Sequence, residues 1–75
     1  MHHEKYIWRN PEIMLGKPVI KGTRITVELI IRKFAEGYTV KEIIESYPHL
    51  GTEQIYAALA YAADIIANEE ILEGA

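Results

Sequence analysis

The sequence contains no cysteine, and beyond Lys41 it contains no lysine or arginine. The absence of cysteine excludes disulfide bonds and thiolate metal sites, and it is typical of a protein that works in a reducing cytoplasm. No apolar run approaches the length of a membrane span, and the start of the chain has no signal-peptide core. We therefore expect a cytoplasmic protein without a membrane segment.

The length of 75 residues leaves room for a single domain with one core. A composition of 49% hydrophobic and 25% charged residues is that of a folded globular chain, not a disordered one. Chains of fewer than roughly 70–80 residues seldom bury enough apolar surface alone, and most need disulfides, a metal or a partner chain. Since disulfides are excluded, self-association as a homodimer is the expected remedy.

Charge is divided unevenly along the chain. Residues 1–41 hold all eight basic side chains together with four glutamates, a net charge of +4, whereas residues 42–75 hold seven acidic side chains, a net charge of −7. Such asymmetry indicates two surfaces for two different partners, although a chance distribution in a short chain would look the same.

Residues 1–26 have the composition of an arm with short strands and turns. Tyr6–Arg9 is aromatic and β-branched, which indicates an edge strand or arm. Val19–Ile20 and Arg24–Thr26 flank Gly22, so this stretch is expected to form a small hairpin or a bulged extended segment.

Three helices are expected within residues 27–72. The first follows Thr26, which can cap it, and ends at Gly37. The second has the capping-box pattern, with Thr39 as the cap and Glu42 three residues later, and the proline after Tyr47 stops it. Both carry apolar residues at helical spacing.

The third helix is expected to begin at a capping Thr52, after a turn whose one apolar residue, Leu50, fills the gap between helices. Two apolar stripes run along this helix. One stripe is expected to face the core: Ile55, Leu59, Ala62 and Ile66. The other has no expected partner within the chain and is therefore the predicted dimer interface: Ala58, Tyr61, Ile65 and Leu72.

The order of a short helix, a capped second helix, a tight turn and a third helix is that of a helix-turn-helix DNA-binding module. The predicted fold class is mainly α, with a three-helix, helix-turn-helix core and a short β hairpin or arm before it. Any three-helix bundle would show the same periodicities. A protein–protein interaction or dimerisation module without DNA-binding activity is therefore the alternative.

Catalytic constellations are missing from the sequence. There is no Ser/His/Asp arrangement that could be placed, no glycine loop for phosphate and no Glu-Xaa-Xaa-His pair. Glu42 and Glu45 share a helix, but a capping role and a solvated face account for them better than an acid and base pair. His2-His3 is expected to be a flexible end and His49 a solvated or capping side chain. We expect no enzymatic activity, no cofactor and no metal.

Six separated motifs follow one another between Asn10 and Ala63. They are Asn10-Pro11, Gly16-Lys17-Pro18, Gly22-Thr23-Arg24-Ile25, Gly37-Tyr38-Thr39, Tyr47-Pro48-His49-Leu50 and Ala58-Leu59-Ala60-Tyr61. In these motifs the chain resembles the bacterial and archaeal family catalogued as domain-of-unknown-function 433. The resemblance implies a homeodomain-like helix-turn-helix fold with a short β element. It also implies a role like that of antitoxins, often encoded beside a PIN-like ribonuclease toxin.

Binding to operator DNA would divide two tasks between different parts of the chain, since phosphate neutralisation supplies most of the affinity and base-edge contacts specify the sequence. Glutamine can pair bidentately with adenine, and glutamate can accept from cytosine. The base-facing candidates stand at the start of the third helix: Thr52, Glu53, Gln54 and Tyr56. The phosphate-contacting candidates lie in the basic half: Lys17, Lys21, Arg24, Arg32, Lys33 and Lys41. For Arg24 a structural role, holding carbonyls or a carboxylate at the base of the first helix, is an equal alternative.

Overall fold

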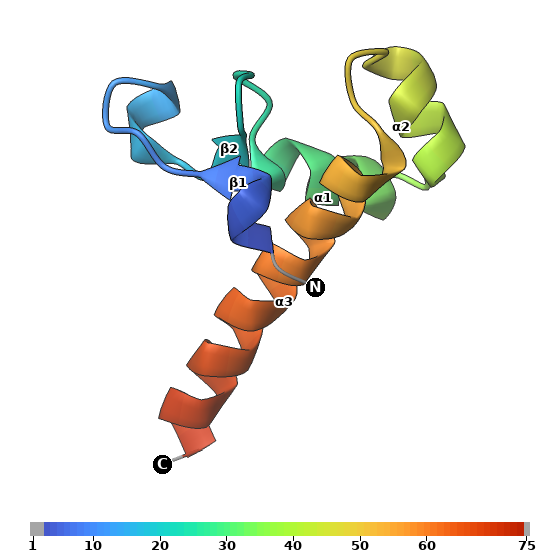
Figure 1. Cartoon of the computed structure of the whole chain (residues 1–75). Coiled ribbons are helices and arrows are strands. Elements are labelled where there is room, and N and C mark those ends of the chain that lie inside the picture. The colour runs from blue at the N-terminus through green and yellow to red at the C-terminus, as the bar shows by residue number, and fades with distance from the viewer. Residues whose placement is uncertain (1–2, 75) are drawn as a thin grey trace.

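The computed structural model describes residues 3–74, and it describes the side chains of residues 3–68. The described residues form two 3₁₀ turns, two short strands and three α-helices (Figure 1). These elements are η1 (His3–Lys5), β1 (Ile7–Trp8), η2 (Met14–Gly16), β2 (Val19–Ile20), α1 (Val27–Ala35), α2 (Val40–Ser46) and α3 (Thr52–Gly74). The predicted mainly helical fold with a short β element before the helices is confirmed.

The two strands form a small antiparallel sheet. Ile7 lies opposite Ile20 and Trp8 lies opposite Val19, while Val19 also forms a single bridge with Thr26. The predicted edge strand near the amino terminus is therefore confirmed. The predicted hairpin around Gly22 is present as this one bridge, with hydrogen bonds from the Ile20 N–H to the Ile25 carbonyl (2.8 Å) and from the Val27 N–H to the Pro18 carbonyl (2.9 Å).

The ends of α1 follow their sequence signals. The Thr26 hydroxyl accepts a backbone hydrogen bond in the first turn, as an N-cap does. At the other end Gly37 adopts a φ of 97°, a left-handed conformation that favours glycine. Its N–H donates to the Phe34 carbonyl (2.9 Å), and the Tyr38 N–H donates to the Lys33 carbonyl (3.0 Å). This pair of bonds is a Schellman motif, and it turns the chain into α2.

The capping box of α2 is confirmed in both directions. The Glu42 N–H donates to the Thr39 hydroxyl (3.1 Å), and the Thr39 N–H donates to the Glu42 carboxylate (2.9 Å). The helix ends at Ser46, two residues before Pro48.

The start of α3 differs from the prediction by one residue. Thr52 is the first helical residue, so Gly51 stands in the capping position. Because Gly51 has no side chain to cap with, the Gln54 side chain reaches back and its Oε1 accepts from the Gly51 N–H. This is the second half of a capping box without the first.

The core lies where α1, α2, the sheet and the first half of α3 meet. Its fully or nearly fully buried side chains are Ile7, Val19, Ile20, Val27, Ile30, Ile43, Leu50, Ile55, Ala57 and Ala58. Leu50 fills the turn between α2 and α3, as predicted. Ala58 was predicted to lie on an outer stripe and to form a dimer interface, and this is wrong. Its methyl group belongs to the chain's own core, because a small side chain lets neighbouring elements approach α3 closely.

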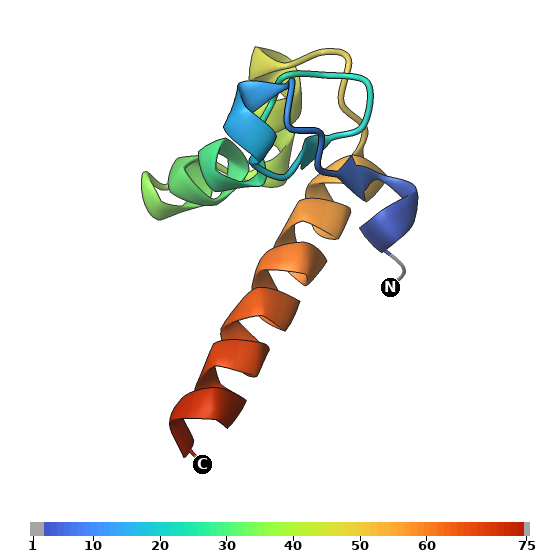
Figure 2. The ribbon, with the colours of Figure 1, turned by 90° about the vertical axis from the view of Figure 1, so that its left-hand side faces the viewer.

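The second half of α3 projects away from the rest of the molecule, as two perpendicular views show (Figures 1 and 2). The predicted core stripe on α3 therefore ends at Ala62, which is partly buried, and Ile66 is 55% exposed. About three helical turns continue beyond Ala62. None of the helices among the described residues combines the length and the apolar character that a bilayer span requires.

Candidate nucleic-acid interface and a neighbouring apolar groove

The four predicted base-facing residues lie together on the first turns of α3, but two of them already have partners within the chain. The hydroxyl of Tyr6 donates to the Glu53 carboxylate at 2.7 Å. Gln54 holds the Gly51 N–H through its Oε1. Thr52 is exposed, and Tyr56 is 48% exposed.

The hydrogen bond of Gln54 limits what its amide can read. A bidentate pair with adenine uses the amide oxygen as acceptor and the amide nitrogen as donor. Since the oxygen is turned toward the Gly51 N–H, the amide nitrogen is the group left to face DNA. Gln54 in this conformation offers donors, which match the acceptor atoms of a base edge.

Three of the predicted phosphate-contacting residues are paired with acids on or near α1. Glu28 accepts from Lys17 at 3.3 Å and pairs with Arg32 at 2.9 Å. Hydrogen bonds from Arg32 and Lys17, together with their positive charges, lower the pKa of the Glu28 carboxyl from its ordinary value. The Lys33 Nζ lies 3.7 Å from the Glu36 Oε1 and 4.8 Å from the centre of the Tyr38 ring. These cations are partly neutralised before any DNA arrives.

The other three predicted phosphate-contacting residues have no acidic partner among residues 3–68. Lys21, Arg24 and Lys41 are exposed, and their side chains make no hydrogen bond or ion pair with residues 3–68. The structural role considered for Arg24 is therefore wrong, since its guanidinium has no carbonyl or carboxylate partner in this part of the chain. The turn between β2 and α1 carries two of these cations, and the third lies on α2.

Tyr61, predicted to form the dimer interface, is covered by the amino-terminal segment. Arg9 donates from Nε to the Tyr61 hydroxyl at 2.9 Å, and its guanidinium stands 5.8 Å from the ring centre. The His3 ring meets Tyr61 edge-on at 5.2 Å, and it also contacts Asp64, with 2.9 Å between Nε2 and Oδ2. The prediction that Tyr61 has no partner within the chain is wrong, as is the prediction that His3 is a flexible end.

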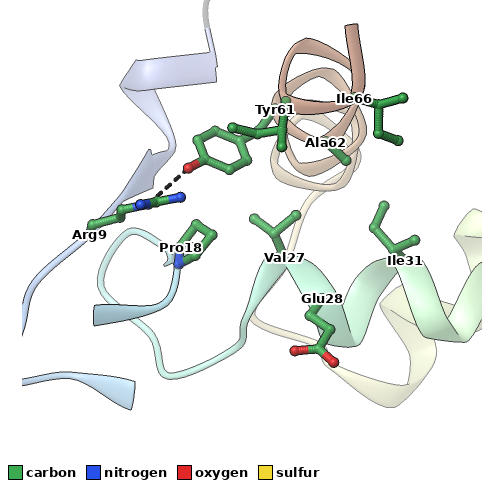
Figure 3. Close-up of a pocket in the computed structure, with 9 residues that line it drawn as sticks. Arg9, Pro18, Val27, Glu28, Ile31, Tyr61, Ala62 and Ile66 are labelled. Carbon is green, nitrogen blue, oxygen red and sulfur yellow. Dashed lines mark hydrogen bonds between the residues drawn. The ribbon is translucent and has the colours of Figure 1, made fainter. Parts of the chain in front are cut away.

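An apolar groove with a volume of about 260 Å³ opens between α1 and α3, beside the Arg9–Tyr61 pair (Figure 3). Val27 and Ile31 come from α1, and Ala62 and Ile66 face them from α3. The remaining lining residues are Arg9, Pro18, Glu28, Tyr61 and Ile65. No pattern in the sequence indicated this groove, because the residues of its two helical walls are at least thirty positions apart in the chain.

Of the predicted dimer residues, Ile65 remains available at the surface, with 39% of its side chain exposed. Leu72 lies outside the residues whose side chains the structure describes. No cluster of three potential metal ligands occurs among the described residues.

The chain is similar to known proteins in sequence and in structure. The sequence profile of the family described as "Protein of unknown function (DUF433)" matches residues 7–62. The uncharacterized protein y4eO of Sinorhizobium fredii (strain NBRC 101917 / NGR234) is 38% identical over 53 residues, which are 71% of this chain and 24% of that protein. A crystal structure of a DUF433 member protein from Anabaena variabilis ATCC 29413 superposes with a TM-score of 0.76 at 30% identity. That match covers 79% of this chain and 58% of the other. The chain thus spans less than two thirds of each of these relatives.

Proposed function

Because the chain belongs to the DUF433 family of proteins of unknown function, we propose a function from its surface: a DNA-binding, antitoxin-like helix-turn-helix protein that acts as a homodimer. The proposed activity is binding, without enzymatic catalysis or a cofactor. A PIN-like ribonuclease toxin is the proposed protein partner, on the strength of the family resemblance.

The observation that carries the proposal is the separation of charge in space. The turn between β2 and α1, which holds Lys21 and Arg24, lies with α2 at the end of the molecule opposite the carboxyl end of α3 (Figures 1 and 2). Lys41 stands on α2. After Glu53, every charged residue of α3 is acidic. A duplex approaching the first end meets these three cations and stays away from the four acidic residues within 63–74, although Glu42 and Glu45 of α2 also lie at that end.

Base reading is assigned to the exposed side of the first turns of α3. Thr52 and Tyr56 are exposed there, and the Gln54 amide nitrogen adds a donor. Glu53 is held by Tyr6, so it serves to position the amino-terminal segment in the free protein. The absence of basic side chains from this helix agrees with a division between phosphate contacts and base contacts.

A second candidate function is an interaction module without DNA binding. Two observations favour it: Glu53 and Gln54 are engaged within the chain, and the second half of α3 carries exposed isoleucines. In that case α3 serves as a contact surface for a protein partner.

Gel shifts with AT-rich and GC-rich duplexes at low salt distinguish the two functions. The native protein is expected to shift duplex DNA, and Gln54→Ala is expected to reduce its preference between the two compositions. Because Gln54 also caps α3, circular dichroism must show that the variant is folded. A folded protein that shifts neither duplex, alone or with a co-purified partner, supports the interaction module.

A further inference from the structure

The groove between α1 and α3 has apolar walls that include exposed side chains in the isolated chain. Ile66 is 55% exposed and Ile65 is 39% exposed, at the point where α3 leaves the body. Isolated apolar side chains at a surface are ordinary, but here they continue the wall formed by Val27 and Ile31. The result is one apolar surface shared by two helices.

We propose that this groove is the self-association site, and that its occupant is the projecting half of α3 from a second copy of the chain. The inference rests on the proposed homodimer and specifies its interface. A twofold axis beside the groove lets each copy lay residues 63–74 across the groove of the other. Ile65 and Ile66 lie both in the groove wall and at the start of the projecting segment, as a self-complementary interface requires.

Charge identifies a second copy as the occupant. Arg9 and Glu28 line the groove, and Lys17 and Arg32 pair with Glu28, so these four side chains, the basic rim of the groove, together carry a net charge of +2. Residues 63–74 contain one aspartate and three glutamates and no basic residue. The projecting segment of one copy is thus complementary to the rim of another, whereas a basic helix would meet charge of its own sign.

This interface differs from the one expected from the sequence. Ala58 is buried in the core of its own chain, and Tyr61 is occupied by Arg9 and His3. The contact surface is therefore rotated toward Ile66 and shared with Ile31 of α1. It uses the basic half and the acidic half of the chain in one interface.

Ile66→Lys tests the proposal, because the side chain is largely exposed in the single chain and its replacement spares the core. Ala67→Lys is the matched control, since Ala67 is exposed and lies about 100° around the helix from Ile66. In analytical ultracentrifugation at micromolar concentration, the native chain is expected to be a dimer, and Ala67→Lys a dimer weakened only by the repulsion between the added charge and the basic rim. Ile66→Lys is expected to be a monomer with an unchanged circular dichroism spectrum. A monomeric native chain, a dimeric Ile66→Lys, or equal dissociation by Ala67→Lys would each overturn the proposal.

Arg32→Glu tests the charge argument separately. Removing a rim cation and adding an acid is expected to weaken dimerisation about twofold to fivefold at low salt, with a smaller effect at high salt. Lys41→Glu, on α2 and away from the groove, is expected to leave the dimer unchanged, and an equal effect of both would contradict the rim's role. DNA shifts and ultracentrifugation report on different surfaces. A dimer that binds no DNA refutes the proposed DNA binding and leaves the groove interface standing, whereas a DNA-binding monomer refutes the homodimer and its groove interface and leaves the DNA binding standing.

Discussion

The hydroxyl of Tyr6 donates a 2.7 Å hydrogen bond to the carboxylate of Glu53, across 47 positions of sequence. This bond attaches the segment before β1 to the first turn of α3, where base reading is proposed. The hydrogen bond, with smaller contributions from burial and from the negative charge of Glu53, raises the pKa of the Tyr6 phenol above its ordinary 10.0. The amino-terminal segment and α3 are therefore coupled through a titratable group.

The coupling predicts a dependence of stability on alkaline pH. Since the folded state holds the phenolic proton more tightly than the unfolded state, the hydrogen bond stabilises fully below pH 10.0 and its effect disappears as the pH rises through the raised value. Tyr6→Phe is expected to lower the melting temperature near neutral pH and to flatten its alkaline decline. Tyr56→Phe is the control, because Tyr56 has no hydrogen-bond partner among residues 3–68. An alkaline decline equally steep in Tyr6→Phe and the native chain would contradict this assignment.

Glu28 predicts the opposite pH dependence. Its lowered pKa means that the ion pairs with Arg32 and Lys17 stabilise the fold above the unfolded value of 4.5, and that this contribution disappears as the pH falls through the folded value. Glu28→Gln is expected to reduce the loss of stability on acidification, as measured by urea unfolding at several pH values. Glu45→Gln, at an exposed carboxyl without such partners among residues 3–68, is expected to leave the acid dependence as in the native chain. If both variants behave alike, the ion pairs on α1 do not stabilise the fold.

Leu50→Ala is expected to destabilise the protein by about 2–4 kcal/mol, because it removes a buried side chain that is 3% exposed and leaves a cavity between α2 and α3. Leu15→Ala provides the same chemical change at a side chain that is 93% exposed, and it is expected to stay within about 0.5 kcal/mol of the native value. Urea unfolding measures both. Equal midpoints for the two variants would show that the turn is not packed as described.

Local signals predicted most of the helical fold. Thr26, Gly37, Thr39 and Pro48 each mark a helix end by a mechanism that acts within about four residues, so the sequence alone places these boundaries. Leu50 was identified as core because it is the single apolar residue of a polar turn. The start of α3 was missed by one residue, because glycine at the cap is served by a glutamine that lies beyond it.

The features of the candidate site that the sequence did not predict are interactions between segments far apart in the chain. Arg9 with Tyr61 and Tyr6 with Glu53 join the arm to α3, and no periodicity within one helix can indicate such pairs. They changed the expected site, since Tyr61 is covered and Glu53 is occupied. The groove between α1 and α3 could not be predicted from the sequence for the same reason.

Thr39 and Thr52 both stand near the start of a helix, so replacing each by alanine compares a capping threonine with a non-capping one. Thr39→Ala removes both the side-chain acceptor and the reciprocal geometry of the capping box, and it is expected to cost about 1 kcal/mol. Thr52→Ala replaces a first-turn residue that does not cap α3, and it is expected to stay within about 0.5 kcal/mol. Thermal unfolding of both variants checks the corrected boundary. A larger loss for Thr52→Ala would restore threonine as the cap of α3.

The salt dependence of duplex binding tests the central claim most directly, with Lys41→Ala and Lys17→Ala compared by fluorescence anisotropy. Lys41 is free of ion pairs with residues 3–68, whereas Lys17 is paired with Glu28. The native protein is expected to bind duplex DNA at low salt, with the logarithm of its affinity falling linearly with the logarithm of the salt concentration. Lys41→Ala is predicted to reduce that slope by about 0.9 for each phosphate that Lys41 neutralises, and Lys17→Ala is predicted to reduce it less. Absence of binding at low salt by the folded protein, or a slope unchanged by Lys41→Ala, would contradict DNA binding through the free cations.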